Sequence, residues 1–195
     1  MGLKQQIGGN IMNYYIADLH FGHKNIIKYD GRPFLTPDEM DQTLIKNWNN
    51  TISDNDTVFI LGDISWYNSD KTAEILNGLK GHKVLIWGNH DRMSPKVAQC
   101  FDKICDYLEI TDGGNKVILC HYPMPFWNGQ FRGSIHLYGH VHNTYQDDLM
   151  QELINTMNKK QDISMHAFNV GCMMKHMGYK PRTLKEILEA NKVKK

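Results

Sequence analysis

Metal-binding side chains follow each of five short apolar runs in this 195-residue chain. The runs YYIA, VFIL, VLIW, VILC and HLY lead into D-L-H, G-D, G-N-H-D, H and G-H-V-H, so the candidate ligands are Asp18, His20, Asp63, Asn89, His121, His140 and His142. Ligands gather at the carboxyl ends of strands in open α/β sheets. Because alternate strand residues share a face, His140 and His142 are predicted to point the same way and to share one ion.

The candidate ligand set combines carboxylate, imidazole and amide groups without a thiolate. This mixture suits Mn, Fe, Zn or similar divalent ions and differs from the cysteine-rich set of a structural zinc site. Seven ligands are too many for one ion. Two ions about 3.5 to 4 Å apart would use them all if one carboxylate bridges. The sequence therefore predicts two divalent metal ions as cofactors.

Short apolar runs alternate with helix-like stretches, which predicts a layered α/β sandwich. The expected strands are residues 13–17, 57–61, 83–87, 107–110, 116–120, 135–138 and 167–170. Thr36, Pro37 and Glu39 have the pattern of a helix-starting capping box, and Ser94 and Thr183 begin similar patterns. The turn sequence D-G-G-N at 112–115 predicts a hairpin, so mixed sheets are expected rather than all-parallel ones.

Composition restricts the class of protein. The formal net charge of +1 shows no excess of basic residues, which argues against a nucleic-acid partner or an anionic membrane surface. The four cysteines have no CxxC spacing, and no secretory signal or membrane-spanning apolar run is present, so a reduced, cytoplasmic protein is expected. We expect an N-terminal extension over residues 1–12 and a single domain over 13–191. The sequence predicts no particular oligomeric state.

The ordered motifs D-x-H, GD, GNH(D/E), H and GHxH resemble those of the calcineurin-like metallophosphoesterases, and the match runs from Asp18 to His142. The stretches DLHFGHKNIIKYDGRPF, GDISWYN, CHYP and YKPRTLKEI are similar to a small bacterial and phage-type branch of predicted phosphoesterases. The chain lacks the GDxVDRG and GNHE of the protein Ser/Thr phosphatase branch. Cys120 stands where many relatives have Gly, which is expected to alter packing and leave ligation intact.

The resemblance implies a four-layer α/β/β/α sandwich with mixed sheets. It also implies the distribution of ligands between the two ions: Asp18, His20 and His142 on one, Asn89, His121 and His140 on the other, and Asp63 as the bridge. A hydroxide between the two ions is the expected nucleophile, attacking phosphorus in line.

His90 is the expected general acid, because it lies beside the ligand Asn89 and an unperturbed imidazole titrates near about pH 6.5. Arg32, Asn89 and His90 are the expected substrate contacts. Arg132 is either a phosphate contact or a solvated or loop-pinning arginine, and Asp91 has no assigned role. The aromatic residues Phe126, Trp127 and Phe131 are either a base-stacking platform or a plug for their loop.

These features predict a dinuclear metal-dependent phosphohydrolase, either a phosphodiesterase or a phosphomonoesterase. The expected substrate is a phosphate ester or anhydride of a small molecule, for which a nucleotide is one candidate. The first alternative is a nuclease of the same superfamily acting on a polymer, which the balanced charge argues against. The second is a non-catalytic binding scaffold. It is disfavoured because Asp63, His90 and every ligand type are present.

Overall fold

Two β-sheets stack face to face in the computed structural model, which describes residues 11–161 and 164–192. Within these residues the first sheet has the strand order β4-β3-β2-β1-β9 and the second β5-β6-β7-β8. The strands of the first sheet are β1 (Asn13–Ile16), β2 (Thr57–Ile60), β3 (His82–Ile86), β4 (Lys103–Cys105) and β9 (Arg182–Thr183). Those of the second are β5 (Tyr107–Asp112), β6 (Asn115–Cys120), β7 (Ile135–Tyr138) and β8 (His166–Asn169).

Both sheets are mixed, as the sequence predicted. Strands β1 to β4 run parallel, and β9 pairs with β1 in the antiparallel sense. Strands β6, β7 and β8 run parallel, and β5 is antiparallel to β6. The predicted hairpin is confirmed, because Asp112 and Asn115 pair across the turn between β5 and β6.

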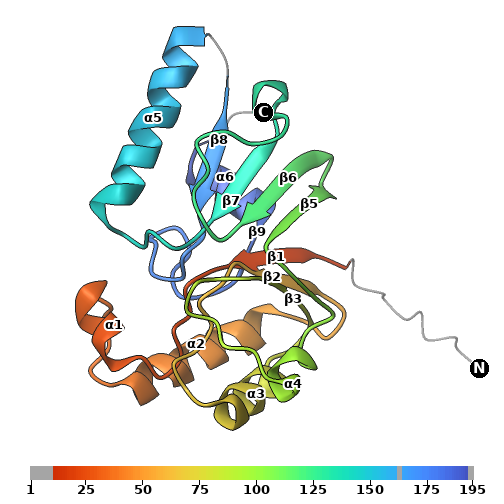
Figure 1. Cartoon of the computed structure of the whole chain (residues 1–195), viewed down its shortest axis with the longest axis vertical. Coiled ribbons are helices and arrows are strands. Elements are labelled where there is room, and N and C mark those ends of the chain that lie inside the picture. Colours follow the sequence, from red (N-terminus) through yellow and green to blue (C-terminus); the bar gives the residue numbers. More distant parts are fainter. Residues whose placement is uncertain (1–10, 162–163, 193–195) are drawn as a thin grey trace, which may run out of the picture.

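Helices cover the two outer faces of the sheet pair (Figure 1). The helices α2 (Pro37–Thr51), α3 (Ser69–Gly78) and α4 (Pro95–Ala98) lie together beside the first sheet, and α5 (Tyr145–Gln161) lies beside the second. The remaining helical elements are α1 (Lys24–Tyr29), α6 (Leu184–Ala190) and the 3₁₀ turn η1 (Gln130–Arg132).

The second sheet is buried on both faces, as alternation along its strands shows. In β6, Val117 and Leu119 belong to the main core shared with the first sheet, whereas Ile118 packs in a separate cluster with Met150 and Ile154 of α5. Successive strand residues point to opposite faces, so the sheet lies between the first sheet and α5. The layers are therefore α/β/β/α, which confirms the predicted fold class.

The predicted helix starts are also found. The hydroxyls of Thr36 and Ser94 accept hydrogen bonds from backbone N–H groups three residues on, and Thr183 forms a complete capping box with Glu186. At α2 the box is altered, because the Glu39 carboxylate accepts from the N–H of Leu35 rather than from that of Thr36. Strands β4 and β9 were not predicted, since elements of three and two residues carry no periodic pattern.

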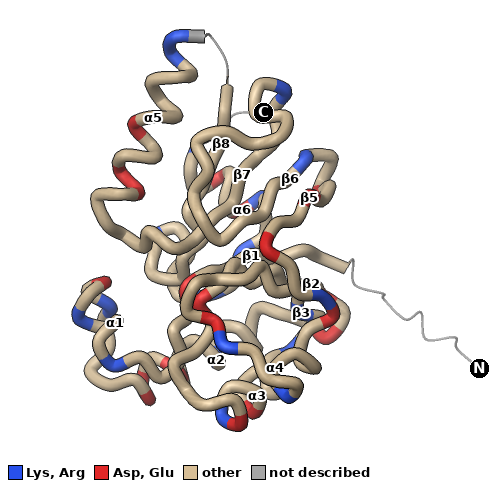
Figure 2. Tube along the Cα trace, in the orientation of Figure 1, with Lys and Arg blue, Asp and Glu red and all other residues tan. Residues whose placement is uncertain are grey.

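The expected extension over residues 1–12 falls mainly on residues 1–10, outside the described residues. Ile11 and Met12 are exposed, and the Met12 carbonyl accepts a hydrogen bond from the N–H of Thr57 at the start of β2. The domain boundaries at residues 13 and 191 stay a prediction. Figure 2 shows positive and negative residues interspersed along the trace, in line with the near-zero net charge.

Candidate metal centre

All seven predicted ligands lie just beyond the carboxyl ends of strands. Asp18 and His20 follow β1, Asp63 follows β2, Asn89 follows β3, His121 follows β6, and His140 and His142 follow β7. The two sheets are joined at this end, because the N–H of Ala17 donates to the carbonyl of Val170 and Cys172 donates back to Ala17. The strand ends of both sheets therefore converge on one place.

Four of the ligands form a compact group. One ligand atom from each of Asp18, His20, Asp63 and His142 lies within 4.8 Å of the others. The Nε2 atoms of His20 and His142 are 3.2 Å apart, and His20 Nε2 is 3.6 Å from Asp63 Oδ2. The side chains of Asp18, His20 and Asp63 are almost fully buried.

The other ligands meet at the amide oxygen of Asn89, so His140 and His142 lie in different groups and do not share one ion as their alternation had predicted. This oxygen is 3.1 Å from His121 Nε2 and 2.8 Å from His140 Nδ1. His121 Nε2 is also 3.7 Å from Asp63 Oδ1. Asp63 therefore directs one carboxylate oxygen toward each group of ligands.

The protons of two imidazoles are placed by hydrogen bonds on the outer side of the rings. His142 Nδ1 lies 2.7 Å from Asp30 Oδ1, and His121 Nδ1 lies 2.7 Å from the Leu61 carbonyl. A carboxylate or carbonyl oxygen only accepts, so each Nδ1 donates and each neutral ring turns its Nε2 lone pair inward. Acceptor atoms then face one another across the centre. Divalent cations fit such an arrangement, because they replace the missing donors.

The backbone is strained where it carries these ligands. Five of them have positive φ: Asp18 (54°), His20 (52°), Asp63 (57°), His140 (69°) and His142 (50°). Non-glycine residues seldom occupy this region, and such conformations concentrate at functional sites. Two glycines make room beside the carboxylates: a Cβ at Gly88 would collide with Asp63 Oδ1, and one at Gly139 would lie 2.7 Å from Asp18 Oδ2.

Burial shifts the ionisation of the ligands when no cation is present. It raises the pKa of Asp18 to about 6 and lowers the pKa of His20 and of His140. Burial alone would lower the pKa of His142 too, but the hydrogen bond to Asp30 and the charges of Asp18 and Asp30 raise it overall. Neutral His20 and His140 are ready to bind a metal without losing a proton.

The structure gives Asp91 a role that the sequence left open. Its carboxylate accepts hydrogen bonds from the backbone N–H groups of Asp63, Ile64 and Gly88, at 3.1, 2.8 and 2.9 Å. The loops that follow β2 and β3 are thereby tied together. Asp91 thus orients the segments that carry Asp63 and Asn89.

Residues 14–194 match the calcineurin-like phosphoesterase family. The chain belongs to this family. An uncharacterized protein of Methanocaldococcus jannaschii is 37% identical over 178 residues, covering 90% of this chain and 89% of the relative. The Gene 66 protein of Mycobacterium phage D29 is 30% identical over 158 residues, covering 67% and 78%. The solved structure of AQ665 from Aquifex aeolicus, a protein of unknown function, matches at 26% identity and a TM-score of 0.70, covering 93% of this chain and 100% of the other.

Membership of the calcineurin-like phosphoesterases confirms the resemblance read from the motifs and indicates phosphoesterase activity. Across residues 11–161 and 164–192, no helix combines the length and apolar character needed to cross a bilayer.

Arg32 does not occupy the substrate-contact position that the sequence predicted for it. The side chain is fully buried and pairs with Asp30 at 2.8 Å, and its guanidinium donates to the backbone carbonyls of Asp18 and Leu19 at 2.9 and 3.0 Å. A guanidinium with no exposed surface cannot reach a substrate. Arg32 therefore supports the strained backbone at Asp18 through a hydrogen bond to its carbonyl, and it neutralises Asp30.

The rim of the centre contains His90 and two aromatic residues that the motifs did not single out. His90 is exposed, and its backbone N–H donates to Asp63 Oδ1 at 2.9 Å. Its ring lies 4.6 Å from the ring of Trp66, which stacks on His23 at 4.0 Å. Tyr122 lies edge-on to His140 at 4.6 Å. Asp30 and Trp66 belong to the sequence stretches KYDGRPF and GDISWYN that carried the resemblance. Only the tertiary contacts show that Asp30 lies beside His142 and Trp66 beside His90.

The aromatic cluster after His121 is divided by the fold. Trp127 is buried, and its indole N–H lies within hydrogen-bonding distance of the carbonyl and hydroxyl of Ser134, at 3.2 and 3.1 Å. Phe126 and Phe131 are exposed. Trp127 therefore plugs the loop, and a joint stacking platform of all three rings is not formed.

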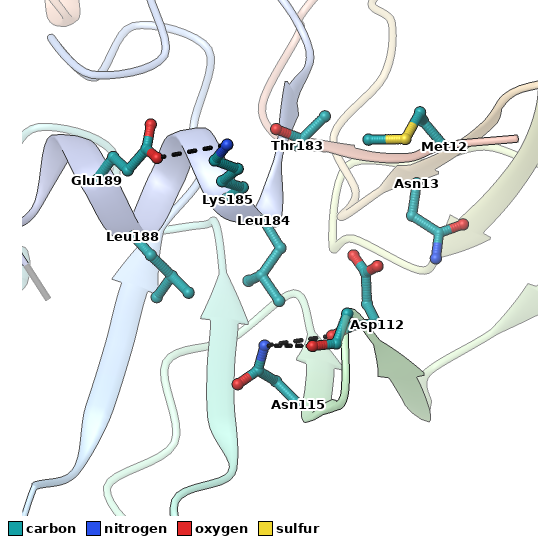
Figure 3. Close-up of a pocket in the computed structure, with 10 residues that line it drawn as sticks. Met12, Asn13, Asp112, Asn115, Thr183, Leu184, Lys185, Leu188 and Glu189 are labelled. Atoms are coloured by element: carbon teal, nitrogen blue, oxygen red, sulfur yellow. Dashed lines mark hydrogen bonds and ion pairs between the residues drawn. The ribbon is translucent and has the colours of Figure 1, made fainter. Parts of the chain in front are cut away.

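A cavity of about 480 Å³ lies away from the predicted metal ligands (Figure 3). It is bounded by Met12 and Asn13 at the amino end of β1, by the β5–β6 turn, and by Leu184 and Leu188 of α6. The predicted metal ligands Asp18 and His20 lie beyond the opposite end of β1. This cavity is therefore separate from the candidate metal centre.

Proposed function

We propose that this protein is a dinuclear metal-dependent phosphohydrolase that cleaves a phosphate ester or anhydride of a small substrate. The observation that carries the proposal is the orientation of Asp63, whose Oδ2 is 3.6 Å from His20 and whose Oδ1 is 3.7 Å from His121. A carboxylate between two groups of acceptors is the arrangement that a pair of cations requires.

In this proposal Asp18, His20 and His142 hold one cation and Asn89, His121 and His140 hold the other, with Asp63 shared. When bound, a pair of divalent cations supplies an activated water as nucleophile and neutralises charge on the phosphoryl oxygens. The metals are Mn, Fe, Zn or similar, as the oxygen and imidazole ligands favour.

The groups around the proposed cation sites have separate tasks. Asp30 and the Leu61 carbonyl keep the protons of His142 and His121 on Nδ1, so that both rings present a lone pair inward. His90 is exposed at the rim and donates a proton to the leaving oxygen. Asn89 and His90 also contact the phosphate.

The substrate is a small phosphorylated molecule, because the balanced charge of the chain offers no extended basic track for a polymer. We further propose a cytoplasmic location, since Cys100, Cys105, Cys120 and Cys172 are all free thiols in the structure.

The test uses metal-stripped protein to which Mn²⁺ is added in steps. We expect two ions per chain by elemental analysis and hydrolysis of bis(p-nitrophenyl) phosphate that rises with the second ion. Asp63→Asn is expected to reduce the metal content below two and to abolish hydrolysis, whereas Asp38→Asn, an exposed acidic residue of α2, retains both. Full activity of Asp63→Asn, or no metal-stimulated hydrolysis by the wild type, would refute the proposal.

A further inference from the structure

A polar cavity adjoins the rim of the metal centre on the side of His90. It has a volume of about 120 Å³ and is lined by Ser65, Trp66, Asn89, His90, Asp91 and Arg92. One proposed metal ligand and the proposed proton donor are thus part of its wall. A group that receives a proton from His90 would lie in or against this cavity.

The cavity continues away from the metal ligands. A second cavity of about 270 Å³ shares Ser65, Asp91 and Arg92 with the first and extends to Asn68 and Ser69. Arg92 therefore lines both compartments, at the place where they join. The two together have room for a leaving group larger than a simple alcohol.

Arg92 is available to bind an anion. The carboxylate of its neighbour Asp91 already accepts hydrogen bonds from three backbone N–H groups. The arginine ion pairs found in residues 11–161 and 164–192 are those of Arg32 with Asp30 and of Arg182 with Glu186. Arg92 is exposed, and over these same ranges it forms no hydrogen bond through its guanidinium.

Trp66 forms a fixed wall of the same cavity. Its ring stacks on His23 with an angle of 6° between the planes and lies 4.6 Å from His90. The stack restrains the indole, and 42% of the residue remains exposed. A planar or sugar-like group that enters past His90 would contact this surface.

We propose that Arg92 and Trp66 form a leaving-group subsite that selects substrates whose leaving group carries its own phosphate, as a nucleotide does. This inference rests on the proposed function, because a leaving group lies beside His90 only if His90 is its proton donor. The planar guanidinium pairs with two phosphate oxygens at once, which a neutral alcohol cannot provide. Phosphoanhydrides and diesters of nucleotides are thus preferred to simple alcohol esters.

The experiment compares two substrates with the Mn²⁺-loaded protein: diadenosine tetraphosphate, whose leaving group is a nucleotide, and bis(p-nitrophenyl) phosphate, whose leaving group has no phosphate. We expect Arg92→Gln to lower the ratio of the two kcat/KM values by about tenfold or more, mainly by raising KM for the nucleotide. Arg92→Lys should retain part of the ratio, because it keeps the charge and loses the fork. Trp66→Leu should lower the ratio in the same direction.

Lys185→Gln is the matched control. It also removes one positive charge, but Lys185 lines the separate cavity at the amino end of β1 (Figure 3), so the ratio is expected to stay at the wild-type value. An unchanged ratio in Arg92→Gln, or wild-type hydrolysis of bis(p-nitrophenyl) phosphate without hydrolysis of diadenosine tetraphosphate, would overturn the subsite while the proposed function stands. Failure of the wild type on both substrates would instead overturn the proposed function.

Discussion

His142 donates its Nδ1–H to Asp30 over 2.7 Å, and Asp30 in turn is paired with the buried Arg32. The Nε2 of His142, which lies 3.2 Å from the Nε2 of His20, is thereby presented in one tautomer and one orientation. The pairing joins β7, which precedes His142, to the loop after α1, more than a hundred residues earlier.

Asp30→Asn is expected to weaken metal binding by about 10- to 100-fold, because the amide orients His142 less strongly and lacks the negative charge. The measurement is titration of metal-stripped protein with Mn²⁺ against a chelating indicator. Asp38→Asn, on the exposed first turn of α2, serves as control. Equal affinities of the wild type and Asp30→Asn for Mn²⁺ would show that Asp30 does not support metal binding.

Arg32→Gln is expected to lower the free energy of unfolding by about 3 to 5 kcal/mol, since it breaks the buried ion pair and leaves the Asp30 carboxylate with the His142 hydrogen bond but without a guanidinium. Urea unfolding of the metal-free protein measures this loss. Arg132→Gln, at an exposed arginine of η1, should change stability little. Unaltered stability together with a higher KM in Arg32→Gln would instead support the sequence prediction that Arg32 contacts the substrate.

His90→Asn is expected to keep the metal content and to slow esters with poor leaving groups by about 10²- to 10⁴-fold, because these depend most on a donated proton. Esters of p-nitrophenol, a good leaving group, should be slowed much less. Paired kinetics on phenyl and p-nitrophenyl esters measure the difference. A uniform loss across both esters would contradict the role of His90 as proton donor.

His136 is expected to make stability depend on pH. Burial lowers its pKa to about 4, and the neutral ring donates from Nδ1 to the Ile118 carbonyl while Nε2 accepts from the N–H of Met124. The unfolded chain binds the proton more readily, with a pKa of about 6.5. The stabilising contribution is therefore complete above about pH 6.5 and is lost as the pH falls towards 4, by up to about 3 kcal/mol.

The measurement for His136 is the free energy of unfolding of metal-free protein between pH 7 and 4.5, which in His136→Gln should fall less steeply than in the wild type. His82→Gln, at an exposed histidine, should follow the wild-type slope apart from its surface pair with Asp102. Identical slopes for the wild type and His136→Gln would show that His136 does not titrate in this way.

Local patterns predicted much of the fold. The apolar runs before Asp18, Asp63 and Asn89 became β1, β2 and β3 within one residue at either end, and the turn at 112–115 became the hairpin between β5 and β6. These features depend on side-chain alternation and turn chemistry, which neighbouring residues specify. Strands β4 and β9 are too short for such a pattern and exist because they pair with β3 and β1.

The sequence predicted which residues would gather at one place, because each directly follows an apolar run, and the structure places all of them beyond the carboxyl ends of strands. The roles of the residues that support these predicted ligands could not be predicted in the same way. Arg32 and Arg92 are both arginines in loops near ligand motifs, yet one is buried under Asp18 and the other is exposed beside His90. The burial of a side chain and its contacts with residues far away in the sequence depend on how the two sheets pack. The spacing of residues along the chain does not specify that packing.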